Sequence, residues 1–316
     1  IIDMEHLLTD EAIDMISLQQ TAPNEIAGMR RTQGWVTNQY VHFVAQFSKD
    51  FSVCNIAEGN KQAILHFGES DGTPIISKVG ISIVSEENAR GNLENDVKGF
   101  DFDAVHTQAR NRWVDELRTI IVESKDENAL KNFYTAMYHA KIIPNMASDV
   151  NVQYRRHNME IGQVADGHKY YSTFSLWDTF RAWNPLITLI NTDLVNDMVK
   201  SYVEMYDTSG ELPLWPLSAG ETNTMIGYHS VSVIADAYLK GILDKDFDIK
   251  HAYEAMKISS DKNSKGSDYY IKYGFIPSNI KKESVSCLLE FAYDDWCISQ
   301  VAEKLGYAAD AERYKE

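Results

Sequence analysis

Residues 174–183 (FSLWDTFRAW) are apolar nearly all round, which predicts a buried helix. The segment nevertheless carries Asp178 and Arg181, three residues apart on one helical face. Desolvating a charge is costly unless the charge is paired. Two interpretations remain open. Either the two side chains form an ion pair that fixes helix packing, or Asp178 and Trp177 face a polar ligand such as a sugar, which needs an apolar surface and ionised hydrogen-bond partners.

Residues 212–227 form a second unusual segment, an apolar loop that contains Trp215. A loop must still satisfy its backbone hydrogen bonds, and loops of this kind often carry function. Glu221 and Asn223 lie just before a helix that we expect from Tyr228, so either could instead cap that helix. Four residues exclude a regular element here: Pro213, Pro216, Gly220 and Gly227.

The third segment lies within a long apolar helix expected over residues 283–305, where Asp294 and Asp295 follow each other. Adjacent side chains on a helix point about 100° apart. We therefore expect at most one of the two carboxylates to reach a pocket, and the other to cap or pair.

The sequence offers weak signals for other chemistry. Asp244, Asp246 and Asp248 imitate the start of a calcium loop, but Ile249 replaces the turn glycine and Ala255 replaces the bidentate glutamate. We reject that site. The histidines lack zinc-site spacing, and no CxxC, phosphate loop or nucleophile elbow occurs.

Composition narrows the classes of partner. The 316 residues carry a net charge of -16, which repels a phosphate backbone and argues against nucleic acid. No apolar run approaches the roughly 18 residues of a membrane span. Cys287 and Cys297 lie about 15 Å apart along one expected helix, too far for a disulfide. We expect the cysteines to be small buried apolar groups.

The first part of the chain shows a period of two, which is typical of strands. Residues 33–48 predict a strand with one well-buried face, and shorter strands are expected at 52–56, 62–67 and 74–84. Residues 5–20 are ambiguous between helix and strand. The spacing of the turns favours an antiparallel sandwich.

After residue 84 the period becomes helical. Ser85 is expected to cap a short helix, and residues 103–123 and 126–143 predict two helices joined by a two-residue turn. Residues 149–171 are irregular, a hairpin or long loop. Further helices are expected at 173–184, 192–206, 228–241, 248–259 and 283–305. Such helices with short connections indicate antiparallel helical pairs.

Both ends of the sequence suggest a fragment. Residue 1 is Ile with no targeting segment before it, and residues 308–316 begin an amphipathic helix that stops after about two turns. We expect a partial strand domain over residues 1–84, a helical linker over 85–102 and a helical domain over 103–316.

The three unusual segments resemble motifs of glycoside hydrolase family 92, the calcium-dependent exo-α-mannosidases. The motifs are FSLWDTFR (174–181), GETNTMIG (220–227) with His229 after it, and EFAYDDWCISQVAEKLG (290–306). The likeness continues in order along nearly the whole chain. Further segments that carry it are residues 28–35, 78–82, 99–103, 133–139 and 144–150.

The resemblance implies a fold and an activity. The fold is the C-terminal part of an antiparallel β-sandwich followed by the first part of an (α/α)6 toroid, with the pocket between them. The implied activity is removal of terminal α-mannose from glycans with inversion, using Ca2+ to bind and distort the sugar. One carboxylic acid protonates the leaving oxygen and a second carboxylate activates water, the two about 6.5–9.5 Å apart. The resemblance also implies a secreted or periplasmic protein.

The motifs that carry the family's acid, its base and its metal site are absent from residues 1–316, so we assign no catalytic residue and expect the Ca2+ ligands beyond residue 316. A non-catalytic carbohydrate-binding or scaffold protein on the same fold is the alternative. A glycoside phosphorylase would need a phosphate site that we do not find. The part of the mannose pocket that the chain retains is implied to comprise Trp177, Asp178, Glu221, Asn223, His229 and, less directly, Asp295.

Overall fold

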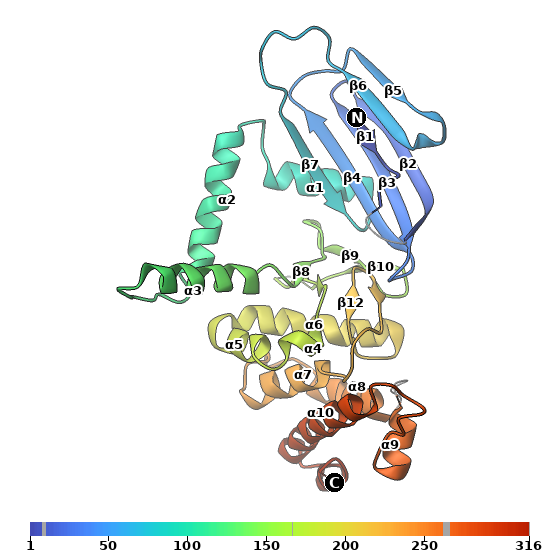
Figure 1. Ribbon diagram of the computed structural model, residues 1–316, viewed down its shortest axis with the longest axis vertical. Helices are drawn as coiled ribbons and strands as arrows, with labels where there is room; N and C mark the ends of the chain where they lie inside the picture. The colour runs from blue at the N-terminus through green and yellow to red at the C-terminus, as the bar shows by residue number, and fades with distance from the viewer. Residues whose placement is uncertain (8–10, 166, 262–265, 316) are drawn as a thin grey trace.

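The computed structural model describes residues 1–7, 11–165, 167–261 and 266–315. A strand-rich body carries the N-terminus, and a helical body carries the C-terminus at the opposite end of the long axis (Figure 1). None of the helices in these described ranges is long and apolar enough to cross a membrane.

Two antiparallel sheets form the strand-rich body. The larger sheet has the order β2-β3-β4-β7 and the smaller one the order β1-β6-β5. The strand expected over residues 33–48 is β4, and those expected over 52–56, 62–67 and 74–84 are β5, β6 and β7. The bounds are β1 (Ile2–Asp3), β2 (Ala12–Ala22), β3 (Glu25–Gln33), β4 (Gln39–Phe47), β5 (Val53–Ile56), β6 (Gln62–His66) and β7 (Ser77–Ser82).

The ambiguous residues 5–20 contribute mainly to strand β2, and strand β3 was not predicted. In β3 the alternation is interrupted by Gly28 and by Arg30 and Arg31, which we had not placed in a strand. Arg31 pairs with Asp14 of β2 at 2.7 Å, and Arg30 donates to the backbone oxygen of His6 at 2.7 Å. Cross-strand partners therefore stabilise a segment whose own pattern is weak.

Both faces of strand β4 are covered. Phe43, Ala45 and Phe47 pack against the smaller sheet, whereas Val44 faces helix α1 (Glu86–Asp96) and is fully buried. The expectation of a single well-buried face was therefore wrong, because α1 returns to cover the outer side of the sheet.

Helix α1 begins as predicted, with the Ser85 hydroxyl accepting the backbone N–H of Asn88. It lies so close to β7 that a Cβ at Gly80 would sit 2.2 Å from the backbone oxygen of Ala89. Only glycine permits this approach. Arg90 of α1 also donates to Glu25 of β3 at 2.6 Å.

Helices α2 (Phe102–Leu117) and α3 (Glu127–Ala140) extend to one side of the molecule (Figure 1). The predicted two-residue turn between them was wrong, since residues 118–126 connect them. Asp126 caps α3 by accepting the backbone N–H groups of Asn128 and Ala129, and the Tyr134 hydroxyl accepts the Val122 N–H.

Two small ribbons follow. The hairpin expected within residues 149–171 is present as β9 (Gln153–Arg155) paired with β10 (Ile161–Gln163). Strand β8 (Asn145–Met146) pairs with β11 (Tyr171–Ser172).

The helical body buries the largest apolar core of the described residues, which includes Tyr202, Ile234, Tyr253, Phe291 and Ile298. Helix α10 packs against α7, α8 and α11. Cys287 and Cys297 are buried on α10, as predicted, whereas Cys54 of β5 is only partly buried. The bounds are α4 (Leu176–Thr179), α5 (Trp183–Ile190), α6 (Thr192–Ser209), α7 (Ser230–Leu239), α8 (Ile249–Asp261), α9 (Ser267–Tyr273), α10 (Ser284–Leu305) and α11 (Ala308–Arg313).

The single helix expected over residues 173–184 was wrong. The chain forms the short α4, leaves helical geometry at Ala182 (φ -136°, ψ -47°) and restarts as α5. Pro185 explains the break, because a continuous helix would lose its hydrogen bond to the Arg181 carbonyl and clash with it. Helix α9 was not predicted.

A buried carboxylate joins the two bodies. Asp149, 9% exposed, accepts hydrogen bonds from the Ser82 hydroxyl at 2.7 Å and from the side-chain amides of Asn88 at 2.8 Å and Asn92 at 2.6 Å. Arg155 adds bonds to the backbone oxygens of residues 83 and 84. The domain boundaries at residues 84 and 102 stay predictions, but this contact shows that strand β7, helix α1 and the following chain share one polar interface.

We expect Asp149→Ala to lower the free energy of unfolding by roughly 2–4 kcal/mol, because it leaves several buried donors without an acceptor. Urea unfolding followed by tryptophan fluorescence measures the change. Asp246→Ala, at an exposed position, is the matched control and should alter stability by less than about 0.5 kcal/mol. Equal effects of the two changes would contradict the assigned role.

Glu25 should make stability depend on pH. Burial alone raises the pKa of its carboxyl, but hydrogen bonds from Arg90, Thr21 and Gln46 outweigh burial and lower the pKa from 4.5 to about 2. A carboxyl whose pKa is lower in the folded state stabilises the fold above its unfolded pKa, and this contribution is lost as pH falls. The window is therefore pH 4.5 to about 2.

We expect Glu25→Gln to cost roughly 3 kcal/mol at pH 7, and the difference from the wild-type chain to shrink below pH 4.5. Urea unfolding at a series of pH values from 7 to 3 checks this. The control is Glu69→Gln, at an exposed position. A Glu25→Gln effect that is constant over the series would show that the carboxylate charge is not responsible.

Candidate functional site

Two tryptophans from different bodies meet at the interface. Trp35 lies between β3 and β4 and is 54% exposed, and its ring centroid is 4.9 Å from that of Trp215 in the loop before α7. The indole N–H of Trp35 donates to the Thr224 hydroxyl at 2.9 Å. The strand-rich body thus places one aromatic face beside another that the helical body supplies.

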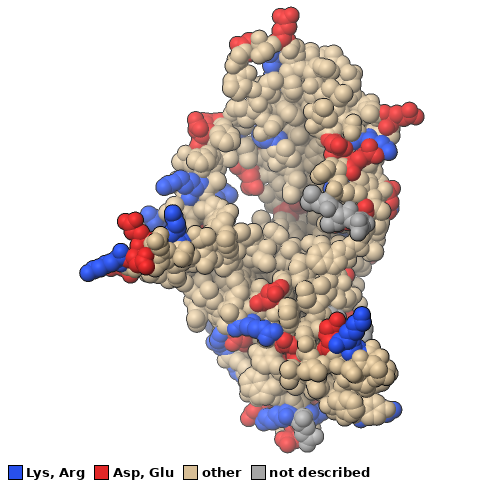
Figure 2. All heavy atoms as spheres, viewed as in Figure 1, with Lys and Arg blue, Asp and Glu red and all other residues tan. Residues whose placement is uncertain are grey.

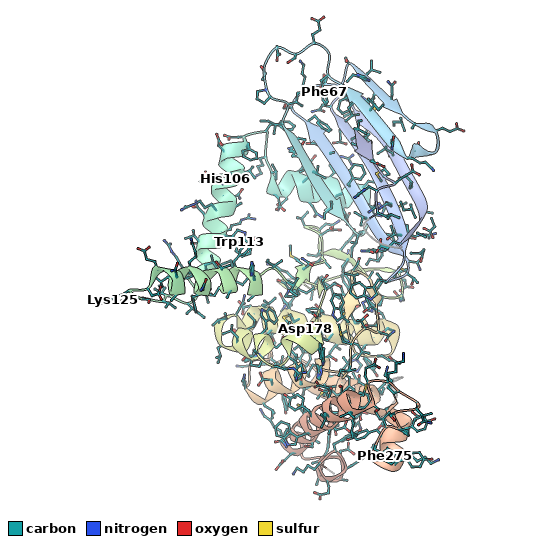
Figure 3. The ribbon with its side chains drawn as sticks, in the orientation of Figure 1. Phe67, His106, Trp113, Lys125, Asp178 and Phe275 are labelled. Carbon is teal, nitrogen blue, oxygen red and sulfur yellow. The ribbon has the colours of Figure 1, made fainter. Side chains whose placement is uncertain are left out.

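Asp178 is connected to this aromatic pair through Ser175. The indole N–H of Trp215 donates to the Ser175 hydroxyl oxygen at 2.9 Å, and the Ser175 hydroxyl donates to the Asp178 carboxylate. Asp178 itself is exposed on α4, in the upper part of the helical body as viewed in Figure 3. An exposed carboxylate beside two indole rings can accept hydroxyl hydrogen bonds while an apolar ring face rests on the aromatics.

The ion-pair interpretation of Asp178 and Arg181 was wrong. Arg181 instead donates to Glu290 of α10 at 2.6 Å, and the same Glu290 oxygen accepts the indole N–H of Trp177 at 3.3 Å. The apolar residues of this segment are buried as predicted, including Phe174, Leu176 and Phe180, but Asp178 is not.

Glu221 holds the apolar loop in shape. One of its oxygens accepts the backbone N–H of Leu214 at 2.9 Å, and the other accepts those of Trp215 at 2.9 Å and Asn223 at 2.8 Å. Glu221 thus supplies hydrogen-bond acceptors for three backbone N–H groups of a loop that has little regular structure. Asn223 is exposed at the turn and adopts a positive φ of 53°.

Neither Glu221 nor Asn223 caps helix α7. The helix begins at Ser230 without a side-chain cap, and the backbone N–H of Tyr228 donates to Asp294 of α10 at 2.8 Å. The capping interpretation was therefore wrong, and the backbone N–H of Tyr228, just before the helix, is bound by a carboxylate 66 positions away.

His229 lies beneath the surface with a buried partner. It is 1% exposed, its Nδ1 is 3.0 Å from Asp294, and its ring stacks on Phe180 with centroids 3.7 Å apart. Burial raises the pKa of Asp294. The turn before His229 needs Gly227, which has φ +78° and whose Cβ would sit 2.3 Å from the His229 ring.

Asp295 also lies inside the helical body. It accepts hydrogen bonds from the hydroxyls of Tyr228 at 2.6 Å and Ser260 at 2.7 Å, and burial raises its pKa. Hydrogen bonds thus connect Asp178, through Ser175 and Trp215, with Glu221 and Asn223. Trp177 instead contacts Glu290 of α10, which also lies next to the buried His229, and Asp295 is buried on α10. The role of the six predicted site residues in ligand binding stays a prediction.

Comparison with known proteins identifies the family. Residues 88–316 match the model of the glycosyl hydrolase family 92 catalytic domain. This chain belongs to glycosyl hydrolase family 92. The predicted family is thereby confirmed.

Solved structures from this family cover nearly all of the chain. A family 92 α-mannosidase from Bacteroides thetaiotaomicron is 32% identical with a TM-score of 0.90, and the match covers 96% of this chain and 44% of that one. An inverting family 92 mannosidase from the same organism is 26% identical with a TM-score of 0.84, over 95% of this chain and 43% of that one. The predicted fold, part of a β-sandwich followed by the first part of an (α/α)6 toroid, is confirmed.

A curated relative is more distant. An uncharacterized secreted glycosidase from Arthroderma benhamiae is 24% identical over 267 residues, which is 77% of this chain and 30% of that protein. The family 92 chain described here therefore spans less than half the length of these relatives.

Trp35 is the residue of the candidate site that sequence reasoning did not select. Its motif, residues 28–35, was recognised, but no role was assigned to it. The sequence signal that could have identified it is a tryptophan directly after Gly34, at the end of a segment of strand-type residues. The partner Trp215 is 180 positions away, so sequence spacing could not reveal the pair.

The described residues do not fit the calcium ion that the family resemblance implied. No group of three or more His, Cys, Asp or Glu in the described ranges could hold a metal ion. The carboxylates of Glu221, Asp294 and Asp295 accept N–H or O–H donors instead. We therefore assign calcium no ligand and no step in this part of the chain.

We expect Glu221→Gln to loosen the loop, because its new NH2 group opposes backbone N–H donors. The expected cost is roughly 1–3 kcal/mol in the free energy of unfolding. Hydrogen exchange at the amides of residues 214, 215 and 223 should accelerate. Glu211→Gln, at an exposed position directly before this segment, is the control, and equal protection of the three amides in both variants would refute the role of Glu221.

Proposed function

We propose that this chain carries part of the mannose-recognition site of an exo-acting family 92 α-mannosidase, which removes terminal α-mannose from glycans with inversion. The observation that carries the proposal is the exposed Asp178 carboxylate, held by Ser175 beside the Trp35–Trp215 pair. Family membership supports it. So does the likeness to the Bacteroides thetaiotaomicron α-mannosidase in complex with mannoimidazole, with a TM-score of 0.89 and 32% identity.

The geometry suggests a division of work. Asp178 accepts hydrogen bonds from sugar hydroxyls, and a carboxylate has enough lone pairs to accept two of them. The indole rings supply the apolar surface on which a pyranose face rests. Ser175 and Glu221 contribute by fixing the Asp178 carboxylate and the Trp215 backbone, respectively.

Two parts of the proposal depend on residues outside this chain. We assign neither the catalytic acid nor the base to a carboxylate of residues 1–316, and we propose that any calcium ligands lie on other residues of a full-length family 92 protein. Export from the cytoplasm is proposed on the name of the Arthroderma relative, a secreted glycosidase.

The proposal is tested with methyl α-mannoside and Asp178→Asn. We expect the 316-residue chain to bind this ligand in saturation-transfer NMR, and Asp178→Asn to weaken binding roughly tenfold or more, since a hydrogen bond to a charged group contributes about 1.5–3 kcal/mol. Asp193→Asn, at an exposed position of α6, should bind like the wild-type chain. Equal binding by both variants would remove Asp178 from the site.

Hydrolysis distinguishes an enzyme from a binding protein. The 316-residue chain should release no p-nitrophenol from p-nitrophenyl α-mannoside. A protein of the relatives' full length should release it in the presence of calcium and lose the activity on chelation. Mannoside binding without hydrolysis by the longer protein would favour the non-catalytic alternative.

A further inference from the structure

Arg181 does not pair with the carboxylate nearest to it in the sequence. Asp178 precedes it by three positions, a spacing that permits ion pairs on a helical surface. Arg181 instead contacts Glu290, 109 positions later, at 2.6 Å. The Arg181 side chain is 52% exposed and that of Glu290 is 13% exposed. The acid that Arg181 contacts is thus less exposed than Asp178, the acid three positions before it.

Contacts with residues other than Arg181 hold the Glu290 carboxylate in place. The oxygen that accepts from Arg181 also accepts the Trp177 indole N–H, and the other lies 3.4 Å from Nε2 of His229. His229 is itself fixed by Asp294 and by stacking on Phe180.

Arg181 completes a layered arrangement around Glu290. Its guanidinium carbon lies 4.6 Å from the centroid of the Phe180 ring and 5.7 Å from that of Trp177. Phe180 also stacks on His229, so the Arg181 cation contacts an aromatic ring and an acid that are both held by other residues. Neither contact involves Asp178.

From this arrangement we infer that Glu290 is a positioning residue that holds Arg181 away from Asp178 and so keeps the Asp178 carboxylate free for the hydroxyls of a neutral sugar. A guanidinium can occupy both oxygens of a carboxylate in a bidentate pair. A neutral ligand would have to break such a pair before it could bind. The inference rests on the proposed function, since it assumes that Asp178 receives the sugar.

Glu290→Gln separates the charge of Glu290 from its shape. The amide oxygen still accepts the Trp177 N–H, but the ion pair with Arg181 is lost and Arg181 can move to Asp178. An exposed ion pair contributes about 0.2–1 kcal/mol, so methyl α-mannoside should bind roughly 1.4- to fivefold more weakly.

The decisive comparison adds Arg181→Met, which keeps an apolar stem near Phe180 and removes the charge. We expect Arg181→Met alone, and the double variant Glu290→Gln/Arg181→Met, to bind methyl α-mannoside within twofold of the wild-type chain. Unchanged binding by Glu290→Gln alone would overturn the inference. So would a double variant that binds as weakly as Glu290→Gln, because Glu290 would then act only through Trp177 and His229. Weaker binding by Arg181→Met alone would show that Arg181 contacts the sugar.

A measurement without ligand separates the positioning role of Glu290 from the proposed sugar-binding role of Asp178. A double-mutant cycle of Asp178→Asn and Arg181→Met is read from urea unfolding. It should be additive in the wild-type background and show coupling of roughly 1.4- to fivefold in the unfolding equilibrium constant in the Glu290→Gln background. Coupling in the wild-type background, which needs no change at Glu290, would overturn the inference. If no chain binds methyl α-mannoside, the proposed function fails while this cycle still decides the part played by Glu290.

Discussion

Asp149 joins strand β7, helix α1 and the start of the helical body through a buried carboxylate with three side-chain donors. The candidate site depends on this contact, because Trp35 comes from one body and Trp215 from the other. Close packing also restrains this interface, since a Cβ at Gly220 would lie 3.1 Å from the Val36 side chain. A small rotation between the bodies would separate the two indoles. The polar interface therefore fixes the shape of the surface on which a ligand could rest.

The carboxylates around that surface carry out different tasks. Glu221 accepts three backbone N–H groups, Asp294 holds His229 and the Tyr228 backbone, and Asp295 accepts two hydroxyls. These groups are costly to bury, and their fixed donors offset the cost. Asp178 differs in that it is exposed and its hydrogen bond comes from a single hydroxyl, that of Ser175.

Figure 2 shows acidic and basic side chains scattered over the visible face without a continuous basic tract, which suits a neutral ligand better than an anionic one.

Local pattern predicted the elements whose own residues decide their structure. Strand β4, the Ser85 cap and the long helix α10 with its buried thiols follow from period, capping chemistry and apolar content. Strand β3 was not predicted, because its arginines are satisfied by residues on other parts of the chain. The break at Ala182 could have been foreseen from Pro185. The motifs located the site residues, but their contacts, such as Trp35 with Trp215, join positions that no spacing rule relates.

Arg181 shows a physical reason why sequence spacing does not predict the partner of a charged side chain. Spacing in a helix predicts which side chains an arginine can reach, and for the helix expected over residues 173–184 it predicted Asp178. It does not determine which acid the arginine chooses, because that depends on the desolvation and anchoring of the alternatives. Glu290 is more deeply placed, and it already holds Trp177 and lies next to His229. An acid whose position is already fixed loses little side-chain entropy when it pairs, whereas Asp178 would have to leave Ser175. The pairing that leaves Asp178 available is therefore set by α10, an element more than a hundred residues away in the sequence.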